Sequence, residues 1–377
     1  MTVFNGSATN HLEAKMFFDP GGTVGIARYD QVKYPEIEHL TKKQISFYWN
    51  PEEVDIIKDA SDFKNVLTPH GQHIFTSNLK RQIILDSVQG RSPTAVFGSV
   101  TALPEMENWA QTWAFFETIH SRSYTHIIQQ IYSDPSIVFD NMMNIPEIVD
   151  CAKDISGYYD DFIEYSMWFQ LLGYGTHYVN GRTIVIDEYI LKKKLWLTVA
   201  AINILEGIRF YVSFACSWAF AENKLMEGNA KIIRMICRDE NLHLASTQKL
   251  MRTILPQDDP IYARIKRDTK DQVIAMYHSA MNQEKTWAKF LFQGGSIIGL
   301  NEPLLCNFID FRGSHMMRAV GYTPDFEAPR RNPLPWTDSW ISSKTVKVAP
   351  QETESSQYVI GGHDSTISEG AFKGFKL

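Results

Sequence analysis

The stretch Trp113-Ala-Phe-Phe-Glu117-Thr-Ile-His120-Ser-Arg-Ser-Tyr124 places an acid, an imidazole and a phenol at helical spacing. Each residue of a helix advances by about 100°, so Glu117 and His120 lie on one face. Tyr124 follows His120 by one further turn, which brings it to within about 40° of both side chains. The apolar residues between them indicate that this helix is largely buried. The stretch therefore predicts half of a metal site with a tyrosine beside it.

The same acid–imidazole spacing recurs at Glu240 and His243. Two lone carboxylates, Asp86 and Glu206, also stand in apolar helical patterns. The order along the chain is carboxylate, Glu-x-x-His, carboxylate, Glu-x-x-His, with one set on each predicted helix. This is the layout of ferritin-like di-iron and di-manganese bundles, which use a Glu from each of two helices and two Glu-x-x-His motifs. Here Asp86 takes the place of one of the two lone Glu residues.

The chemistry of two divalent metals explains this combination. Four carboxylates offset most of the metal charge and can bridge the ions, while two imidazoles leave positions open for O₂. Without metals, the burial of four acids would be very unfavourable. A single pair is weaker evidence, because Glu36 and His39 show the same spacing with no partner carboxylate and are expected at the surface. Asp86 alone could equally be an exposed residue near a helix end, and these ligand types do not distinguish iron from manganese.

The periodicity predicts an all-α, ferritin-like helical bundle with one small excursion. Asn180-Gly181 between two β-prone runs predicts a hairpin near 176–186. We expect an N-terminal arm at 1–35, a helical domain at 36–341 and a flexible tail at 342–377, with an extended segment over the bundle from Pro324 to Trp340. Helices are predicted at 36–48, 69–89, 104–132, 152–172, 187–222, 228–254, 260–295 and 300–320.

Composition narrows the class of protein. The chain has 377 residues, 44% of them hydrophobic, and a net charge of −6 with no dense basic stripe, so nucleic-acid binding is not indicated. None of the four cysteines forms a C-x-x-C motif, which excludes a zinc knuckle or a local redox dithiol and suits the cytoplasm. The N-terminus lacks the form of a signal peptide.

Residues 187–222 are long enough to cross a membrane, but Glu206 and Arg209 in their middle favour the centre of a soluble bundle.

These motifs are similar to those of a known family. The chain resembles the radical-generating small subunit of class I ribonucleotide reductase, and is most like its enterobacterial and T-even phage form. The similarity runs from Met16 into the C-terminal tail, with departures at Asn50, where a basic residue is usual, and at Gln357. The most specific stretches are 46–55, 85–91, 117–126 and 227–234.

The resemblance implies a ferritin-like homodimer with two iron ions per chain, oxo-bridged when oxidised, with manganese as an alternative and O₂ as the oxidant. Tyr124 matches the tyrosine that is oxidised to a stable radical. The implied metal ligands are Asp86, Glu117, His120, Glu206, Glu240 and His243. The implied hydrophobic pocket of the radical consists of Phe210, Phe214 and Ile236. The implied radical-transfer residues are Trp49, Asp239, His120 and, in the tail, Tyr358. The implied docking peptide for the large subunit includes Phe375 and Leu377.

The expected function is therefore that of a ribonucleoside-diphosphate reductase subunit, whose radical passes to a large subunit that makes deoxyribonucleotides. The absence of paired cysteines and of a phosphate-cradling glycine loop agrees with nucleotide chemistry on another protein. Two alternatives share the ligand pattern. One is a di-iron oxygenase that acts on a small organic substrate, and the other is an iron-storage or purely structural helical bundle.

Overall fold

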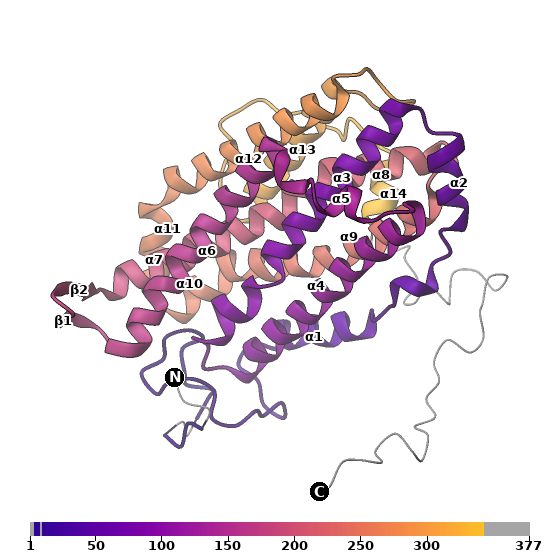
Figure 1. The fold of residues 1–377 in the computed structure, drawn as a ribbon. Coiled ribbons are helices and arrows are strands. Elements are labelled where there is room, and N and C mark those ends of the chain that lie inside the picture. The colour runs from indigo at the N-terminus through magenta and orange to yellow at the C-terminus, as the bar shows by residue number, and fades with distance from the viewer. Residues whose placement is uncertain (1–3, 8–9, 343–377) are drawn as a thin grey trace, which may run out of the picture.

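The computed structural model describes residues 4–7 and 10–342, and these form a bundle of long helices (Figure 1). A two-stranded hairpin projects from one end of the bundle. The all-α prediction is confirmed. The longest helices are α3 (Pro69–Gln89), α4 (Pro104–Ile131), α6 (Pro146–Leu172), α9 (Glu227–Lys249) and α12 (Lys270–Phe292).

Two of these helices begin where local chemistry predicts. Helix α3 starts at Pro69, and the side chain of Thr68 accepts a hydrogen bond from the N–H of Gly71 at 3.1 Å. Such a cap satisfies one of the N–H groups that have no partner within the helix. Helix α4 starts at Pro104 with Glu105 in its first turn, an arrangement that suits both the fixed φ of proline and the helix dipole. The predicted starts of both helices are confirmed.

The most apolar predicted helix contains an interruption. It consists of α7 (Glu188–Ile204), a π-helical turn at Leu205–Arg209 and α8 (Tyr211–Glu222). A π turn inserts a residue into the helical ladder and is common at functional sites. This turn carries Glu206. The run Glu188–Glu222 is long and apolar enough to span a membrane, but its most apolar 18-residue stretch is entirely buried inside the bundle.

The hairpin was predicted at its correct place. Strands β1 (Gly175–Val179) and β2 (Arg182–Ile186) are antiparallel, with Val179 opposite Arg182. Asn180 and Gly181 form the turn with φ of 47° and 79°. Two consecutive positive φ angles are what a tight hairpin turn requires, and Asn-Gly tolerates them best.

Several boundaries differ from the prediction. Helix α6 begins at Pro146 rather than at 152, because proline suits the first position of a helix and the buried residues Ile148 and Cys151 extend the apolar face upstream. The predicted helix 260–295 is two helices, α11 (Pro260–Asp268) and α12, separated at Thr269. The Thr269 hydroxyl donates to the carbonyl of Ile265 at 2.7 Å, a local bond that competes with helix continuation. Short helices α2 (Ile57–Asn65) and α5 (Ser136–Phe139) were not predicted.

Four further helices and the N-terminal segment complete the bundle. These helices are α1 (Pro35–Ser46), α10 (Leu255–Asp258), α13 (Glu302–Ala319) and α14 (Thr337–Ile341). Helix α14 ends the Pro-rich segment, which was predicted to be extended throughout, and it packs against α8 and α9 (Figure 1). The described part of residues 4–34 contains no helix or strand, and it is tied to the bundle by ion pairs from Lys15 to Asp259 and from Lys33 to Asp258.

Candidate metal centre

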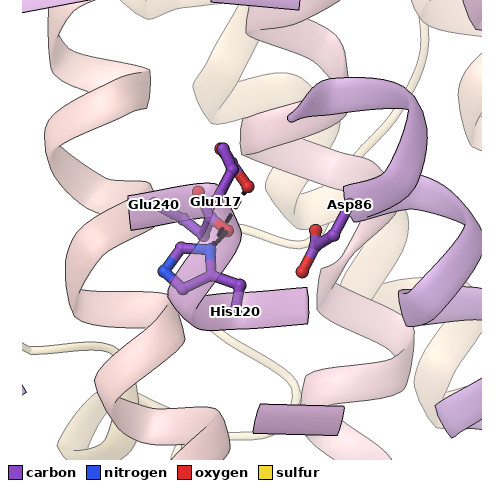
Figure 2. Close-up of side chains that lie close together, drawn as sticks. All are labelled: Asp86, Glu117, His120 and Glu240. Atoms are coloured by element: carbon purple, nitrogen blue, oxygen red, sulfur yellow. Dashed lines mark hydrogen bonds and ion pairs between the residues drawn. The ribbon is translucent and has the colours of Figure 1, made fainter. Parts of the chain in front are cut away.

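The six predicted ligand residues converge at the centre of the bundle. Their ligand atoms form two overlapping groups in which all atoms lie within 4.8 Å of one another. Glu117 and Glu240 belong to both groups, so they occupy the position expected of bridging carboxylates. Figure 2 shows Asp86, Glu117, His120 and Glu240 facing a common point from three helices. The first group is Asp86, Glu117, His120 and Glu240, and the second is Glu117, Glu206, Glu240 and His243.

The two imidazoles present the same ring atom to the shared carboxylates. His120 Nδ1 lies 3.3 Å from Glu117 Oε2 and 3.1 Å from Glu240 Oε1. His243 Nδ1 lies 2.6 Å from Glu240 Oε2 and 3.3 Å from Glu117 Oε1. Each ring therefore directs Nδ1 at the acids. His120 Nε2 lies near Asp239, whereas His243 Nε2 has no hydrogen-bond partner among the described residues. His120 thus has the arrangement typical of histidines that ligate a metal through one nitrogen and are oriented through the other.

The carboxylates at the ends of the cluster accept no hydrogen bond from the described residues, although Glu206 Oε1 lies 4.0 Å from His243 Nδ1. All six ligand residues are 0–1% exposed. Neither oxygen of Asp86 and neither oxygen of Glu206 has a hydrogen-bond partner among the described residues. Buried polar atoms without partners are rare and costly in folded proteins. The donor set, which is oxygen-rich with two nitrogens, fits two divalent cations between these side chains.

The burial and crowding of these acids also shift the pKa values of the cluster in the metal-free protein. Burial, followed by the charges of Glu117 and Glu240, raises the pKa of Asp86 and of Glu206 well above the usual carboxyl value. Burial also acts to raise the pKa of Glu240, but His120 and His243 outweigh it and lower that pKa. Burial opposes the imidazolium forms, yet Glu240 and its neighbours raise the pKa of both histidines. Protons therefore neutralise part of the acid cluster when cations do not.

Trp113 supports the cluster in a way that sequence reasoning missed. Its Nε1 donates to Glu117 Oε1 at 2.8 Å, and its ring stacks on His243 at 4.6 Å between centroids. It therefore orients one ligand from each metal group. The signal was present in the sequence, because Trp113 precedes Glu117 by four residues, but an indole at that spacing is more often ordinary core.

Tyr124 is fully buried beside the cluster. Burial, followed by the negative charge of Asp86, raises the pKa of its phenol well above 10.0. Its hydroxyl has no hydrogen-bond partner among the described residues. The predicted pocket residues Phe210, Phe214 and Ile236 are also 0% exposed and belong to the same hydrophobic core. The phenol is thus held in its neutral form, away from solvent.

A chain of polar contacts leads away from the cluster. His120 Nε2 lies 3.3 Å from Asp239 Oδ2, and the Nε1–H of Trp49 donates to the same oxygen at 2.8 Å. Three of the four predicted radical-transfer residues are therefore contiguous. Arg238, which sequence reasoning did not single out, fixes the segment before Trp49 by donating to the carbonyl of Phe47 at 2.7 Å.

The remaining predictions concern the pair Glu36 and His39 and three residues of the C-terminal tail. His39 is exposed and Glu36 is partly exposed, which agrees with the predicted surface pair. Neither belongs to a possible metal-binding group among the described residues. Tyr358, Phe375 and Leu377 lie outside the described residues.

Comparison with known proteins identifies the family. Residues 27–333 match the family described as ribonucleotide reductase, small chain. The chain is 48% identical over its full length to the ribonucleoside-diphosphate reductase 1 subunit beta of Salmonella typhimurium, covering 99% of that protein. It is 40% identical to the subunit beta of Enterobacteria phage T4, again with 100% and 99% coverage. The ribonucleotide reductase R2 subunit from Clostridium botulinum has the same fold, with a TM-score of 0.77, 20% identity, and coverage of 90% of this chain and 98% of that one.

Fold and site together define a ferritin-like protein with a carboxylate–histidine metal-binding cluster. The cluster joins four helical segments that the sequence separates widely. The chain belongs to the ribonucleotide reductase small-chain family and serves as the beta subunit of a ribonucleoside-diphosphate reductase, so it works with a large subunit.

Proposed function

We propose that this subunit holds a di-iron centre and stores an oxidising equivalent as a radical on Tyr124. The observation that carries the proposal is the convergence of six buried ligand residues beside a phenol that is fully enclosed. When bound, the two metals supply the reaction with O₂ that oxidises the tyrosine. Iron is proposed from the family resemblance. Manganese is the alternative, because the ligand types suit both.

The protein's own residues have three tasks in this proposal. The cluster would hold the metals, and Glu117 and Glu240 would serve both of them because they belong to both ligand groups. The pocket of Phe210, Phe214 and Ile236 excludes water from the phenol of Tyr124, which prolongs the life of a radical.

The third task is transfer to the large subunit, through His120, Asp239 and Trp49 and then Tyr358. Asp239 Oδ2 accepts the indole proton of Trp49 across 2.8 Å, so an electron can leave the ring while the proton shifts to the carboxylate. The large subunit then uses the radical to initiate the reduction of ribonucleoside diphosphates, for which its own thiols supply the electrons.

The assembly is proposed from the same resemblance. The subunit acts as a homodimer in the cytoplasm, of a bacterium or of a host cell if the gene is carried by a phage. The unit 36–341 is the helical domain, and the tail 342–377 docks on the large subunit through Phe375 and Leu377. Removal of the last three residues should abolish binding to the large subunit and leave metal content unchanged. An oxygenase or a storage bundle would not show that pair of results.

The decisive variant is Tyr124→Phe. It should bind the same number of metal ions, lack the tyrosyl signal in electron paramagnetic resonance, and lose turnover with the large subunit. Tyr277→Phe is a matched control, because Tyr277 is also fully buried and its hydroxyl donates to Asn203 Oδ1 at 2.8 Å, remote from the ligands in the sequence. Full turnover in Tyr124→Phe would refute the assignment.

A further inference from the structure

A row of residues on the helical run that carries Glu206 leads from the cluster to the protein surface. These residues follow one another at intervals of four, so each lies about 40° further around the helix than the last and the row is inclined to the helix axis. We call this row the stripe. Twelve residues beyond Glu206 the stripe reaches Trp218, and at a rise of about 1.5 Å per residue its whole length is about 24 Å. Its three aromatic members are 0% exposed, and its last member is exposed. The stripe consists of Glu206, Phe210, Phe214, Trp218 and Glu222.

The aromatic rings along the stripe contact one another. Phe210 and Phe214 stack with centroids 5.5 Å apart and planes 7° apart, and Phe214 meets Trp218 at 5.6 Å. Helix α14 then adds Trp340, which stacks on Trp218 at 6.0 Å with an angle of 11° between the planes. Electron tunnelling falls off steeply with distance, and among these rings only the indoles are readily oxidised, so Trp218 and Trp340 are the members that can relay an electron.

A second oxidisable side chain joins this series close to the cluster. Tyr211 meets the edge of Phe214 at 5.6 Å, and the Sγ of Cys237 lies 4.0 Å from the Tyr211 hydroxyl. Cys237 is three residues before Glu240 on α9, which belongs to both ligand groups, and both Tyr211 and Cys237 are buried. The stripe is therefore connected to two helices that carry metal ligands.

At the outer end of the stripe an indole is hydrogen-bonded to a carboxylate, as Trp49 is to Asp239. The Nε1–H of Trp340 donates to Glu222 Oε1 at 2.9 Å, just as Trp49 donates to Asp239 at 2.8 Å. Trp340 is only partly buried and Glu222 is exposed. An indole beside a carboxylate can lose an electron at lower cost, because its proton moves to the carboxylate at the same time. The bond to Glu222 gives the indole proton an acceptor, and the guanidinium of Arg234 lies 5.7 Å from the centroid of the same ring.

We propose that Trp218, Trp340 and Glu222 form an electron-entry route, separate from Trp49 and Asp239, through which a one-electron donor in solution reduces the oxidised centre. The inference rests on the proposed function for the existence of that centre. The electron donor for this route is a low-potential, one-electron carrier that binds over Trp340.

The electrons and protons balance in two steps. Trp340 passes one electron inward through Trp218, and its Nε1 proton shifts to Glu222. The donor then returns one electron to the indole, and the proton returns from Glu222. The net result is a donor oxidised by one electron and a centre reduced by one electron. Where the acceptor is the Tyr124 radical, it also takes up one proton from solvent and becomes the phenol.

The test is the rate of reduction by the reduced methyl viologen radical in stopped-flow and freeze-quench experiments on the full-length, metal-loaded protein. Trp218→Phe and Trp340→Phe should each react several-fold more slowly than the unchanged protein. Trp196→Phe, which removes another fully buried indole from the same helical run, should react at the original rate. Glu222→Gln, which keeps both stacked rings, should also slow the reaction. Equal rates in all four variants would overturn the proposal.

Two additional measurements keep this result independent of the proposed function. The reaction is followed both by the tyrosyl signal and by the optical absorption of the oxidised metals, so a protein without a radical contradicts the proposed function while the absorption still tests the route. Near-ultraviolet circular dichroism of the metal-free protein should lose the coupled band of the Trp218–Trp340 stack in either Trp variant. If Trp218→Phe does not fold, Trp340→Phe at the surface decides the question.

Discussion

The indole of Trp49 donates its Nε1–H to Asp239 Oδ2 across 2.8 Å, although 190 positions separate the two residues in the chain. Both are essentially buried, at 1% and 0% exposure. The same carboxylate oxygen lies 3.3 Å from His120 Nε2. One acid therefore joins the metal cluster to an aromatic side chain beyond it, which makes Asp239 the most informative residue to change outside the ligand set.

When loaded at saturating metal, Asp239→Asn should form the Tyr124 radical but turn over with the large subunit at least about 100-fold more slowly, the scale on which positioned proton acceptors act. The reason is that an amide does not take up the indole proton. Steady-state assays with saturating large subunit measure the effect. Asp325→Asn, at an exposed carboxylate paired with His278, serves as the control. Near-normal turnover in Asp239→Asn would contradict the transfer role.

Trp113→Phe should weaken metal binding by about 10–100-fold, the usual effect of removing a group that orients a ligand. The variant keeps an aromatic ring against His243 but loses the hydrogen bond from Nε1 to Glu117 Oε1. Competition with a chromophoric chelator gives the affinity. Trp196→Phe should bind metal normally. Unchanged affinity in Trp113→Phe would show that Glu117 needs no support from the indole.

Metal removal should lower the melting temperature, because the metals bind the folded protein and not the unfolded chain. Metal at 100 times its dissociation constant should add about 2.7 kcal/mol to the free energy of unfolding. Glu206→Gln should be at least as stable as the unchanged protein when metal-free, since its buried carboxyl is an unpartnered acid. The same variant should gain little stability from metal. Calorimetry with and without chelator checks both statements, and a large gain in Glu206→Gln would be the contrary result.

Arg81→Met should lower the free energy of unfolding by about 3–5 kcal/mol, because it leaves Glu284 as an uncompensated buried charge. Arg81 and Glu284 form an ion pair in which both side chains are 0% exposed. The double variant Arg81→Met with Glu284→Gln should recover part of the loss. Urea unfolding of the metal-free single and double variants measures the coupling. Additive losses would mean that the two residues do not act as a pair.

Asp59 should give the protein a pH-dependent stability that Asp59→Asn lacks. Asp59 accepts the backbone N–H groups of Gly228 and Asn229 at the start of α9, and burial raises its pKa from 3.8 to about 6. An acid with a raised pKa in the folded state contributes stability that is complete below 3.8 and lost as the pH rises through about 6. Between these values the unchanged protein should lose up to about 3 kcal/mol relative to the variant.

Unfolding of both metal-free proteins at a series of pH values between about 4 and 8 tests this statement. A constant difference in stability between the unchanged protein and Asp59→Asn across that range would contradict it. Asp62→Asn, at the neighbouring acid of the same helix, controls for general effects of removing a charge from α2.

Some features of this protein follow from short-range patterns. The spacing of Glu117 and His120, and of Glu240 and His243, is a property of one helix and needs no partner to be recognised. The same holds for the proline at the start of α4 and for the Asn-Gly turn of the hairpin, since each acts through local backbone geometry. Resemblance to a family added the roles of residues such as Trp49, which periodicity alone would place in the core.

The tertiary structure decided the rest, because it depends on which helices become neighbours. The bond between Trp49 and Asp239, the support of Glu117 by Trp113 beside His243, and the stacking of Trp340 on Trp218 join helices far apart in the chain. The π turn at Glu206 is also a packing outcome, since the local sequence reads as an uninterrupted helix. Local spacing therefore predicts which residues can bind metal, whereas the packing of whole helices determines what surrounds the metals.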